Sequence, residues 1–155
     1  RLEVSPIVGI HLWYDRQVMA QSFVGFLDSP VQWVFNRSLI QGSDDQSGQY
    51  LCISISGAWD FIDMPKEAIR DVFAREMERL FPGARDARIE RCLVVKEPRA
   101  TFRCIPGAAA HRPSQVTPIP NLALAGEWSD TDWPSTMEGA VRSGVFAADA
   151  VATRI

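Results

Sequence analysis

Apolar side chains along the first part of the chain alternate with a period of two, which predicts β-strands. Residues 4–15 (VSPIVGIHLWYD) are rich in β-branched and aromatic residues and apolar at both alternating sets of positions, as in a central strand. Segments 22–27 and 31–37 flank an Asp-Ser-Pro triplet at 28–30, a composition typical of a turn. We therefore expect a β-hairpin there.

Apolar positions with helical spacing predict one amphipathic helix at about 65–81, because three- and four-residue intervals place them on one face. Further strands are expected at 49–56 and 87–97, with a short extended segment at 99–104. The polar, glycine-containing stretch 41–48 is expected to be a loop. The helix face consists of Ile69, Val72, Phe73, Met77, Leu80 and Phe81.

The last third of the chain has a different pattern. Residues 105–120 are rich in Pro, Gly, Ala and Ser, as in a linker. An apolar strand at 121–125, a loop and a helix at about 135–152 are expected to follow. The pattern predicts an α+β fold: a β-rich region at 1–104, mostly antiparallel sheet with one packed helix, then the linker and a strand-loop-helix at 121–155.

Composition narrows the functional classes. With 155 residues, 46% hydrophobic and 23% charged, the chain has the make-up of a soluble domain with a core. A net charge of -3 without a long basic run excludes a nucleic-acid-binding protein of the usual kind. Since no signal-peptide pattern or long apolar run is visible, a cytoplasmic location is expected. Three scattered cysteines and two histidines predict neither a disulfide framework nor a metal site.

The most specific stretch of the sequence is GEWSDTDWPSTMEGAVRSG at 126–144. Ligands of α/β proteins lie at the carboxyl ends of strands, where Glu127 could accept hydrogen bonds from sugar-like hydroxyls. Ser135 and Glu138 match a capping box. The expected helix start exposes the N–H groups of Thr136 and Met137 to an electron-rich ligand atom. A solvated turn carboxylate and a purely structural cap remain alternatives.

Small residues and tryptophans surround this helix start. Small side chains permit close approach of a backbone or a flat ligand, although tight helix packing would also explain them. The two tryptophans of the loop, Trp128 and Trp133, either cover a hydrophobic edge or line an apolar pocket. The small residues form two lines, Gly139, Ser143 and Ala147, and Ala140, Gly144 and Ala148.

The order of these features resembles a known family. LAGEWSDTDWPSTMEGAVRSGVFAADAV at 124–151 looks like the C-terminal flavin-contacting segment of the flavin-dependent amine oxidase and carotenoid desaturase superfamily. The resemblance is strongest to the squalene-associated FAD-dependent desaturases, also called hydroxysqualene dehydroxylases. SPIVGIHLWYDRQVM, SPVQWVFNRS and RATF are similar to that subfamily too, so the resemblance covers nearly the whole chain.

The resemblance implies roles for six residues in binding FAD. Glu127 would contact the ribityl-pyrophosphate portion, and the backbone at Thr136 and Met137 would approach the N1/O2 edge of the isoalloxazine. Trp133 would line the flavin pocket. Gly126 and Glu138 belong to the same cofactor-binding set. Neither the resemblance nor the spacing identifies a catalytic acid, a catalytic base or a metal ligand.

The implied activity is that of an FAD-dependent oxidoreductase acting on a long isoprenoid. Reductive removal of the hydroxyl of hydroxysqualene, giving squalene for hopanoid biosynthesis, is the first expectation. Carotenoid desaturation, amine oxidation and a non-catalytic α+β binding module are the alternatives. Aromatic residues of the first half would line a substrate tunnel or belong to an ordinary core: Trp13, Phe23, Phe26, Trp33, Phe35 and Trp59.

One family feature does not occur in this sequence, the G-x-G-x-x-G turn that holds the FAD pyrophosphate. The resemblance therefore implies an incomplete FAD-binding domain, whose partner is an N-terminal dinucleotide-binding half of the same protein. By itself this chain is expected neither to retain FAD nor to be active. The low solubility of an isoprenoid substrate adds the expectation of peripheral contact with the inner face of a membrane.

Overall fold

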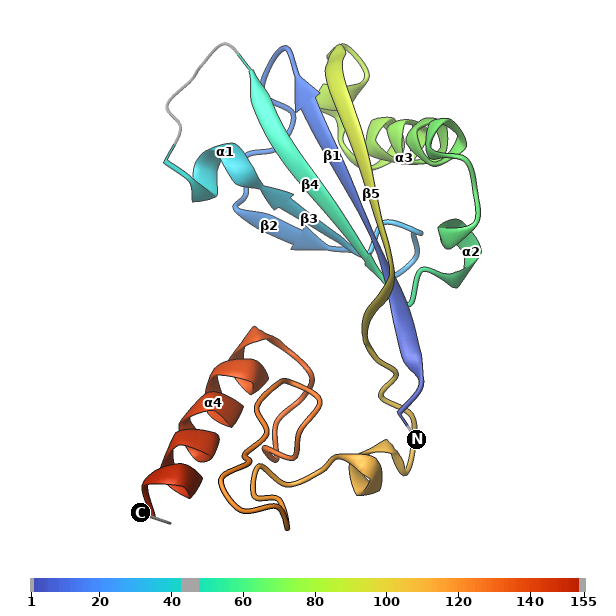
Figure 1. Ribbon diagram of the computed structural model, residues 1–155. Helices are drawn as coiled ribbons and strands as arrows, with labels where there is room; N and C mark the ends of the chain where they lie inside the picture. Colours follow the sequence, from blue (N-terminus) through green and yellow to red (C-terminus); the bar gives the residue numbers. More distant parts are fainter. Residues whose placement is uncertain (1, 43–47, 154–155) are drawn as a thin grey trace. The chain divides into compact units, whose positions relative to one another are not determined.

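The computed structural model describes residues 2–42 and 48–153, which divide into two compact units (Figure 1). The sheet unit is Ser5–Pro98. The terminal unit comprises, of the described residues, 2–4 and 99–153. The sequence predicted domain boundaries at residues 104 and 120. Those boundaries concern the domains of the whole protein, and they stay predictions.

The sheet has five strands in the order β2-β3-β4-β1-β5, and all its pairings are antiparallel. At the ends of β1 and β5, Asp15 N donates to Arg88 O (3.0 Å) and Arg103 N donates to Glu3 O (2.7 Å). An antiparallel sheet was expected, and it is confirmed. The strands are β1 (Val4–Tyr14), β2 (Phe23–Gly25), β3 (Trp33–Asn36), β4 (Gln49–Ser56) and β5 (Ile89–Phe102).

Several expected elements are confirmed. β1 lies between β4 and β5, so it is central, and β2 and β3 form the hairpin. The segments expected at 87–97 and 99–104 are instead one strand, β5, that continues through Pro98. A proline has no N–H to donate, and β5 tolerates it because it is an edge strand.

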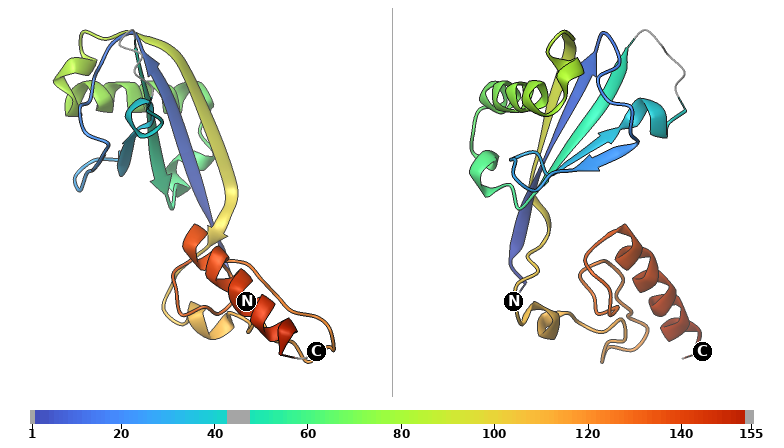
Figure 2. Two further views of the ribbon diagram at one scale, coloured as in Figure 1. Left: turned by 90° about the vertical axis from the view of Figure 1, so that its left-hand side faces the viewer. Right: turned by 180° about the vertical axis from the view of Figure 1, so that it is seen from behind.

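One face of the sheet packs on the amphipathic helix α3 (Lys66–Leu80) (Figure 2). Directly paired residues of neighbouring strands share a face, so Val24, Val34, Ile53 and Ile10 form one row across four strands. Val24 is partly buried in this row, and the other three side chains are completely buried. On α3, the side chains of the face that the spacing predicted close this core. They are Ile69, Phe73 and Met77, each with 0% exposure. Each such side chain contributes roughly 1.5–3 kcal/mol by burial.

The opposite face, here called the open face, is not covered by a helix among the described residues of the sheet unit. The strand register places three rows of side chains on it: Phe23, Phe35, Cys52 and His11; Gly25, Trp33, Ser54 and Gly9; and Tyr50 with Trp13. Trp33 is 46% exposed and Phe23 is 59% exposed. Four of the six aromatic residues expected to line a tunnel or a core thus lie on this surface.

Three short helical segments complete the sheet unit. The sequence pattern did not predict α1 (Arg37–Ile40) or α2 (Trp59–Ile62), which are single turns, or the 3-10 turn η1 (Pro82–Ala84). A capping bond stabilises α1, in which Leu39 N donates to Asn36 Oδ1 (3.1 Å). The centre of the loop expected at 41–48, residues 43–47, lies outside the described residues.

The terminal unit contains the 3-10 turn η2 (Ala108–His111) and the helix α4 (Met137–Ala152). The strand expected at 121–125 is corrected to an isolated bridge between Val116 and Ala123. Pro118 and Pro120 cannot donate to a ladder, and Asn121 adopts a positive φ of 60°, so pairing does not extend. Among the described residues, no helix is long and apolar enough to span a bilayer.

The Phe73 ring is predicted to be a main contributor to the sheet unit's stability. Phe73→Ala should lower the free energy of unfolding by about 3–5 kcal/mol, because it opens a cavity between α3 and the sheet. Exposed Arg75 on the same helix provides the control, and Arg75→Ala should change it by less than about 0.5 kcal/mol. Denaturant titration of both variants measures the difference, and equal midpoints would contradict this packing.

Candidate functional site

The candidate site is the turn at 126–134 together with the start of α4. Gly126 N donates to Ser143 Oγ (2.7 Å), and Ser143 Oγ donates to Ala140 O (2.6 Å) inside the helix. Ser143 is completely buried, so this contact fixes the turn on the helix. Gly126 has φ +151°, and a Cβ added to it would lie 2.3 Å from Trp128 Nε1. Glycine is therefore required here for both conformation and space.

Buried polar side chains hold the rest of the turn. Ser129, also completely buried, donates to Gly126 O (2.8 Å) and accepts from Gln115 Nε2 (3.0 Å). Asp130 N donates to Pro113 O (2.8 Å). Since each bond joins the turn to residues 113–115 or closes it on itself, the turn has one well-defined conformation. The segment expected to be a linker thus supplies part of the support.

Arg112 is the central residue of this network, and the sequence analysis missed it. Its guanidinium donates through Nη1 to Trp133 O (2.7 Å) and through Nη2 to Glu127 O (2.8 Å) and Thr131 Oγ1 (3.2 Å). It also lies over the Phe102 ring, with Cζ 5.4 Å from the ring centre. The planar guanidinium suits several carbonyls at once, so Arg112 brings the backbones of Glu127 and Trp133 together.

The start of α4 differs by one residue from the expected capping box. Thr136, not Ser135, is the N-cap, and Gly139 N donates to Thr136 Oγ1 (3.2 Å). Ser135 Oγ instead lies within hydrogen-bond distance of Thr101 Oγ1. Glu138 pairs with Arg142 Nε (2.8 Å), one turn along the helix. The expected box is corrected because these two side chains have partners elsewhere.

This cap changes which backbone donors a ligand could reach. The first hydrogen bond within the helix runs from Ala140 N to Thr136 O. The N–H of Gly139 already donates to Thr136 Oγ1. The N–H groups of Met137 and Glu138 therefore lie at the first two helical positions, which have no acceptor within a helix. Met137 is 89% exposed. This end of the helix, with its positive dipole, can receive an electron-rich atom.

The carboxylate of Glu127 belongs to a half-buried side chain beside a groove of about 300 Å³. The groove also contains Thr101, Phe102 and Trp128. Arg112 Nη2 donates to the carbonyl of Glu127, so the side chain projects from a fixed backbone. Glu127 can therefore present a carboxylate to the groove, and its contact with the hydroxyls of a ligand stays a prediction.

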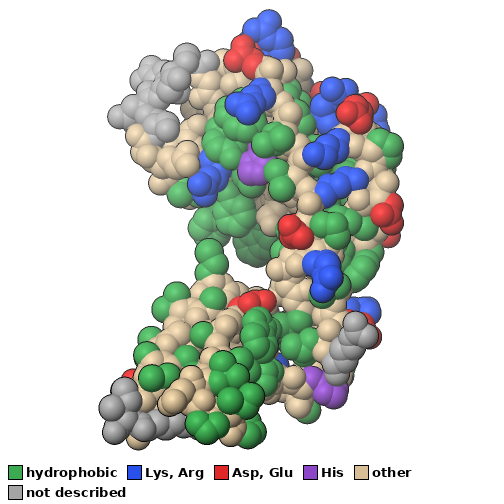
Figure 3. Space-filling view, viewed as in Figure 1, with side chains coloured by type: hydrophobic (Ala, Val, Ile, Leu, Met, Phe, Trp, Pro, Cys, Tyr) green, Lys and Arg blue, Asp and Glu red, His purple; other side chains and the backbone are tan. Residues whose placement is uncertain are grey.

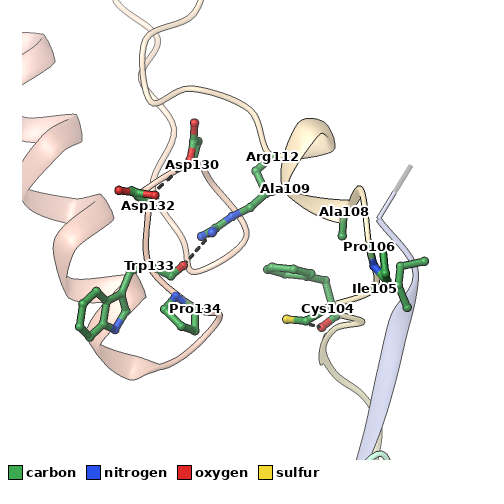
Figure 4. A pocket seen from close by; sticks show the side chains of 11 residues that line it. Cys104, Ile105, Pro106, Ala108, Ala109, Arg112, Asp130, Asp132, Trp133 and Pro134 are labelled. Atoms are coloured by element: carbon green, nitrogen blue, oxygen red, sulfur yellow. Dashed lines mark hydrogen bonds between the residues drawn. The ribbon is translucent and has the colours of Figure 1, made fainter.

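Trp133 borders a second cavity of about 450 Å³ (Figure 4). Arg112 reaches into the cavity from the segment after η2, and Asp130 and Asp132 lie on the side of the turn. The indole ring also carries the guanidinium of Arg142, whose Cζ lies 3.8 Å from its centre. One face of the Trp133 ring is thus covered by Arg142 of α4. The role of Trp133 beside a flavin stays a prediction.

The two lines of small residues have different environments. Gly139 and Ser143 are buried, and a Cβ on Gly139 would lie 2.7 Å from Pro134 O. The close approach that glycine permits here is thus to the chain's own turn. The other line is exposed beside Met137 and Val141, which are 89% and 65% exposed. α4 therefore presents an apolar stripe that the described residues of the terminal unit leave uncovered.

The site suits a flavin better than a metal ion. Its donor set consists of backbone N–H groups at a helix start, one carboxylate, and aromatic rings. Among the described residues there is no cluster of three or more metal-ligating side chains. Arg112 Nε is buried without a hydrogen-bond partner in the described part of the chain. The arrangement thus offers donors and a carboxylate for a polar, flat ligand.

Comparisons with known proteins show the family of this chain. The model of a family described as flavin containing amine oxidoreductase matches residues 1–152. A 15-cis-phytoene desaturase of Synechococcus elongatus is 31% identical over 99% of this chain and 34% of its own length. A hydroxysqualene dehydroxylase of Sinorhizobium fredii is 34% identical over 95% of this chain and 32% of its own. The chain thus spans about a third of the length of these curated relatives.

A solved structure has the same fold. The putative protoporphyrinogen oxidase from Exiguobacterium sp. 255-15 superposes with a TM-score of 0.70 at 11% identity, over 99% of this chain and 35% of that one. At this identity the likeness concerns the fold alone.

The turn is predicted to depend on glycine at position 126. Gly126→Ala should destabilise the terminal unit by about 1–3 kcal/mol, because alanine is strained at this φ and its Cβ would displace Trp128. Gly144 in α4 is the matched control, since a Cβ added there meets no atom within 4 Å. Thermal unfolding of this chain should show a lower midpoint for Gly126→Ala alone, and a loss of the same size in Gly144→Ala would refute the assignment.

Proposed function

The chain belongs to the family of flavin-containing amine oxidoreductases, and from that premise we propose that the whole protein is an FAD-dependent oxidoreductase acting on a long isoprenoid. The observation that carries the proposal is the fixed turn at 126–134, which sets a carboxylate and an open helix start on one rigid segment. Such a segment can bind both the sugar-like and the ring portions of a flavin.

Three parts of the segment have separate tasks in this proposal. The Glu127 carboxylate accepts hydrogen bonds from hydroxyls of the ribityl-pyrophosphate portion. The N–H groups of Met137 and Glu138 face the N1/O2 edge of the ring, where reduced flavin is negatively charged, and the helix dipole favours that charge. Arg112 and Ser143 hold the turn in place through their bonds to Glu127 O and Gly126 N.

FAD would supply hydride transfer, and the protein would supply binding, orientation and exclusion of water. The exposed apolar stripe of α4 supports a further part of the proposal. Met137, Val141 and Val145 lie along it at four-residue spacing, and they are 89%, 65% and 55% exposed. We assign this stripe to contact with a dinucleotide-binding portion of the same protein, which would bind the remainder of FAD.

Hydroxysqualene is the proposed substrate, with reductive dehydroxylation to squalene as the reaction. Two relatives named hydroxysqualene dehydroxylase, from Sinorhizobium fredii and Rhodopseudomonas palustris, are each 34% identical to this chain, and the tryptophan-containing turn resembles that subfamily. The three rows of the open face are rich in aromatic rings and contain no charged side chain, which suits a hydrocarbon ligand. The proposed location is cytoplasmic, with peripheral contact at the inner face of a membrane.

Phytoene desaturation is the second candidate, because the cyanobacterial phytoene desaturase aligns with 99% of the chain at 31% identity. Its reaction would remove hydride from the substrate instead of adding it. Amine oxidation uses the same scaffold. The open face, however, carries no carboxylate in its three rows to pair with an ammonium group.

Product analysis of the whole protein separates these reactions. Purified protein with FAD should convert hydroxysqualene to squalene when a reductant is supplied, and should leave phytoene and amines unchanged. Heat-denatured protein is the control. Formation of a desaturated carotene, or full recovery of hydroxysqualene, would overturn the proposed substrate. A whole protein that purifies without flavin would favour a non-catalytic module.

Flavin retention tests the role of Glu127. In the whole protein, Glu127→Gln should weaken FAD binding by roughly tenfold or more, because a neutral amide replaces a charge-assisted acceptor. Glu90→Gln is the control, since that carboxylate makes only an exposed pair with Arg88. Dissociation constants from flavin fluorescence titration measure both, and unaltered FAD affinity in Glu127→Gln would remove this residue from the site.

A further inference from the structure

The open face carries one hydrogen-bonded polar pair among its aromatic rings. His11 Nδ1 and Tyr50 Oη lie 2.6 Å apart. The Tyr50 ring stacks on Trp13, with centroids 4.5 Å apart and an angle of 7° between the planes. His11 stacks beside the same indole at 6.2 Å. Both members of the pair therefore stack on the Trp13 ring, which fixes their position on the sheet.

The pair lies among aromatic rings, and the Arg91 guanidinium lies over the Trp13 ring beside it. Figure 3 shows hydrophobic side chains on this side of the sheet, with several Lys or Arg side chains beside them. The row of His11 continues through Cys52 to Phe35 and Phe23, and the next row contains Gly9. A Cβ added to Gly9 would meet only His11 Nε2, at 3.5 Å. The surface beside the imidazole thus has no side chain at Gly9, and aromatic side chains follow on β3 and β2.

The pair can form at least one further hydrogen bond. If Tyr50 donates to Nδ1, His11 Nε2 carries the remaining hydrogen, and if His11 donates, the Tyr50 hydroxyl keeps its own. In either case one donor and one acceptor remain. Burial, and after it the positive charge of Arg37, hold the pKa of His11 below its usual value. The imidazole is therefore neutral near pH 7, and the pair suits an uncharged partner.

We propose that His11 and Tyr50 recognise the hydroxyl group of a hydroxylated isoprenoid whose hydrocarbon chain lies across the aromatic rows of the open face. This inference rests on the proposed function and adds to it the residues that select an alcohol. The occupant follows from the chemistry of the surface. The three rows contain no charged side chain, and besides Cys52 and Ser54 their polar side chains are those of the His11–Tyr50 pair. A long hydrocarbon with a single hydroxyl group can place its chain along the rings and its hydroxyl against this pair.

The neighbouring cations do not convert the surface into an anion site. The Arg91 guanidinium lies over the Trp13 ring, with Cζ 4.6 Å from its centre. Arg37 lies in the first turn of α1, outside the three rows. An isoprenoid diphosphate, which these cations could attract, is the competing ligand that an experiment must exclude. The pair acts as a selectivity element, and no proton transfer is assigned to it.

Equilibrium binding to the whole protein with oxidised FAD tests the inference, because no hydride is then available for turnover. Radiolabelled hydroxysqualene and squalene differ by the hydroxyl group alone. The unmodified protein should bind hydroxysqualene about tenfold more tightly, as one hydrogen bond to a part-buried polar pair allows. Tyr50→Phe should abolish this preference and leave squalene affinity unchanged, and His11→Gln should reduce it. Tyr14→Phe, on the buried face of the same sheet, should preserve it.

Several results would overturn the proposal. These are a hydroxysqualene preference that survives in both Tyr50→Phe and His11→Gln, equal binding of the two lipids by the unmodified protein, or tighter binding of farnesyl diphosphate than of hydroxysqualene. A lower melting temperature in Tyr50→Phe with unaltered preference would show that the face is covered by protein. If the preference disappears in Tyr50→Phe while product analysis yields no squalene, the proposed reaction fails and the hydroxyl-binding pair remains.

Discussion

The hydrogen bond from Gly126 N to Ser143 Oγ is the contact on which the candidate site depends. It joins the turn to the middle of α4, and Arg112 holds the backbone of the same turn at the Glu127 carbonyl. The terminal unit has few buried apolar side chains among its described residues, mainly Phe102 and Ala108. Its order therefore comes largely from buried polar groups that satisfy one another, which gives a defined geometry.

The sheet unit is built on a different principle. Its stability comes from an apolar core between one sheet face and α3, and the residues of that core recur at the periods of a strand and a helix. The other face contains aromatic rings and few polar groups, and it remains accessible in this unit. One face of the sheet thus packs into the core, and the other face presents aromatic side chains. Tyr14 lies on the core face and Tyr50 on the other.

The elements that could be predicted are those whose apolar side chains recur at the spacing of a strand or a helix. α3 was predictable because Ile69, Phe73 and Met77 follow its helical repeat, and β1 because its apolar residues occupy both faces. The turns α1 and α2 were not, since four residues are too few to show a period. The strand expected at 121–125 failed because apolar composition alone does not provide a partner, and the prolines at 118 and 120 limit pairing.

The sequence predicted where the candidate site lies, and it did not predict the side chains that hold the site in place. Gly126 and Glu127 stand out in the sequence, but Ser143 and Arg112 join them only through contacts across 15 to 17 residues. Cap position also escaped the pattern, because Ser135 and Thr136 are both good caps and the tertiary contact with Thr101 decides between them.

A crystal structure of the whole protein with FAD tests the central claim most directly. The account predicts that the Glu127 carboxylate contacts hydroxyls of the ribityl-pyrophosphate portion. It also predicts that the N–H groups of Met137 and Glu138 point at the N1/O2 edge of the isoalloxazine, with Gly126 still bonded to Ser143. A flavin bound without contact to residues 126–138 would contradict it.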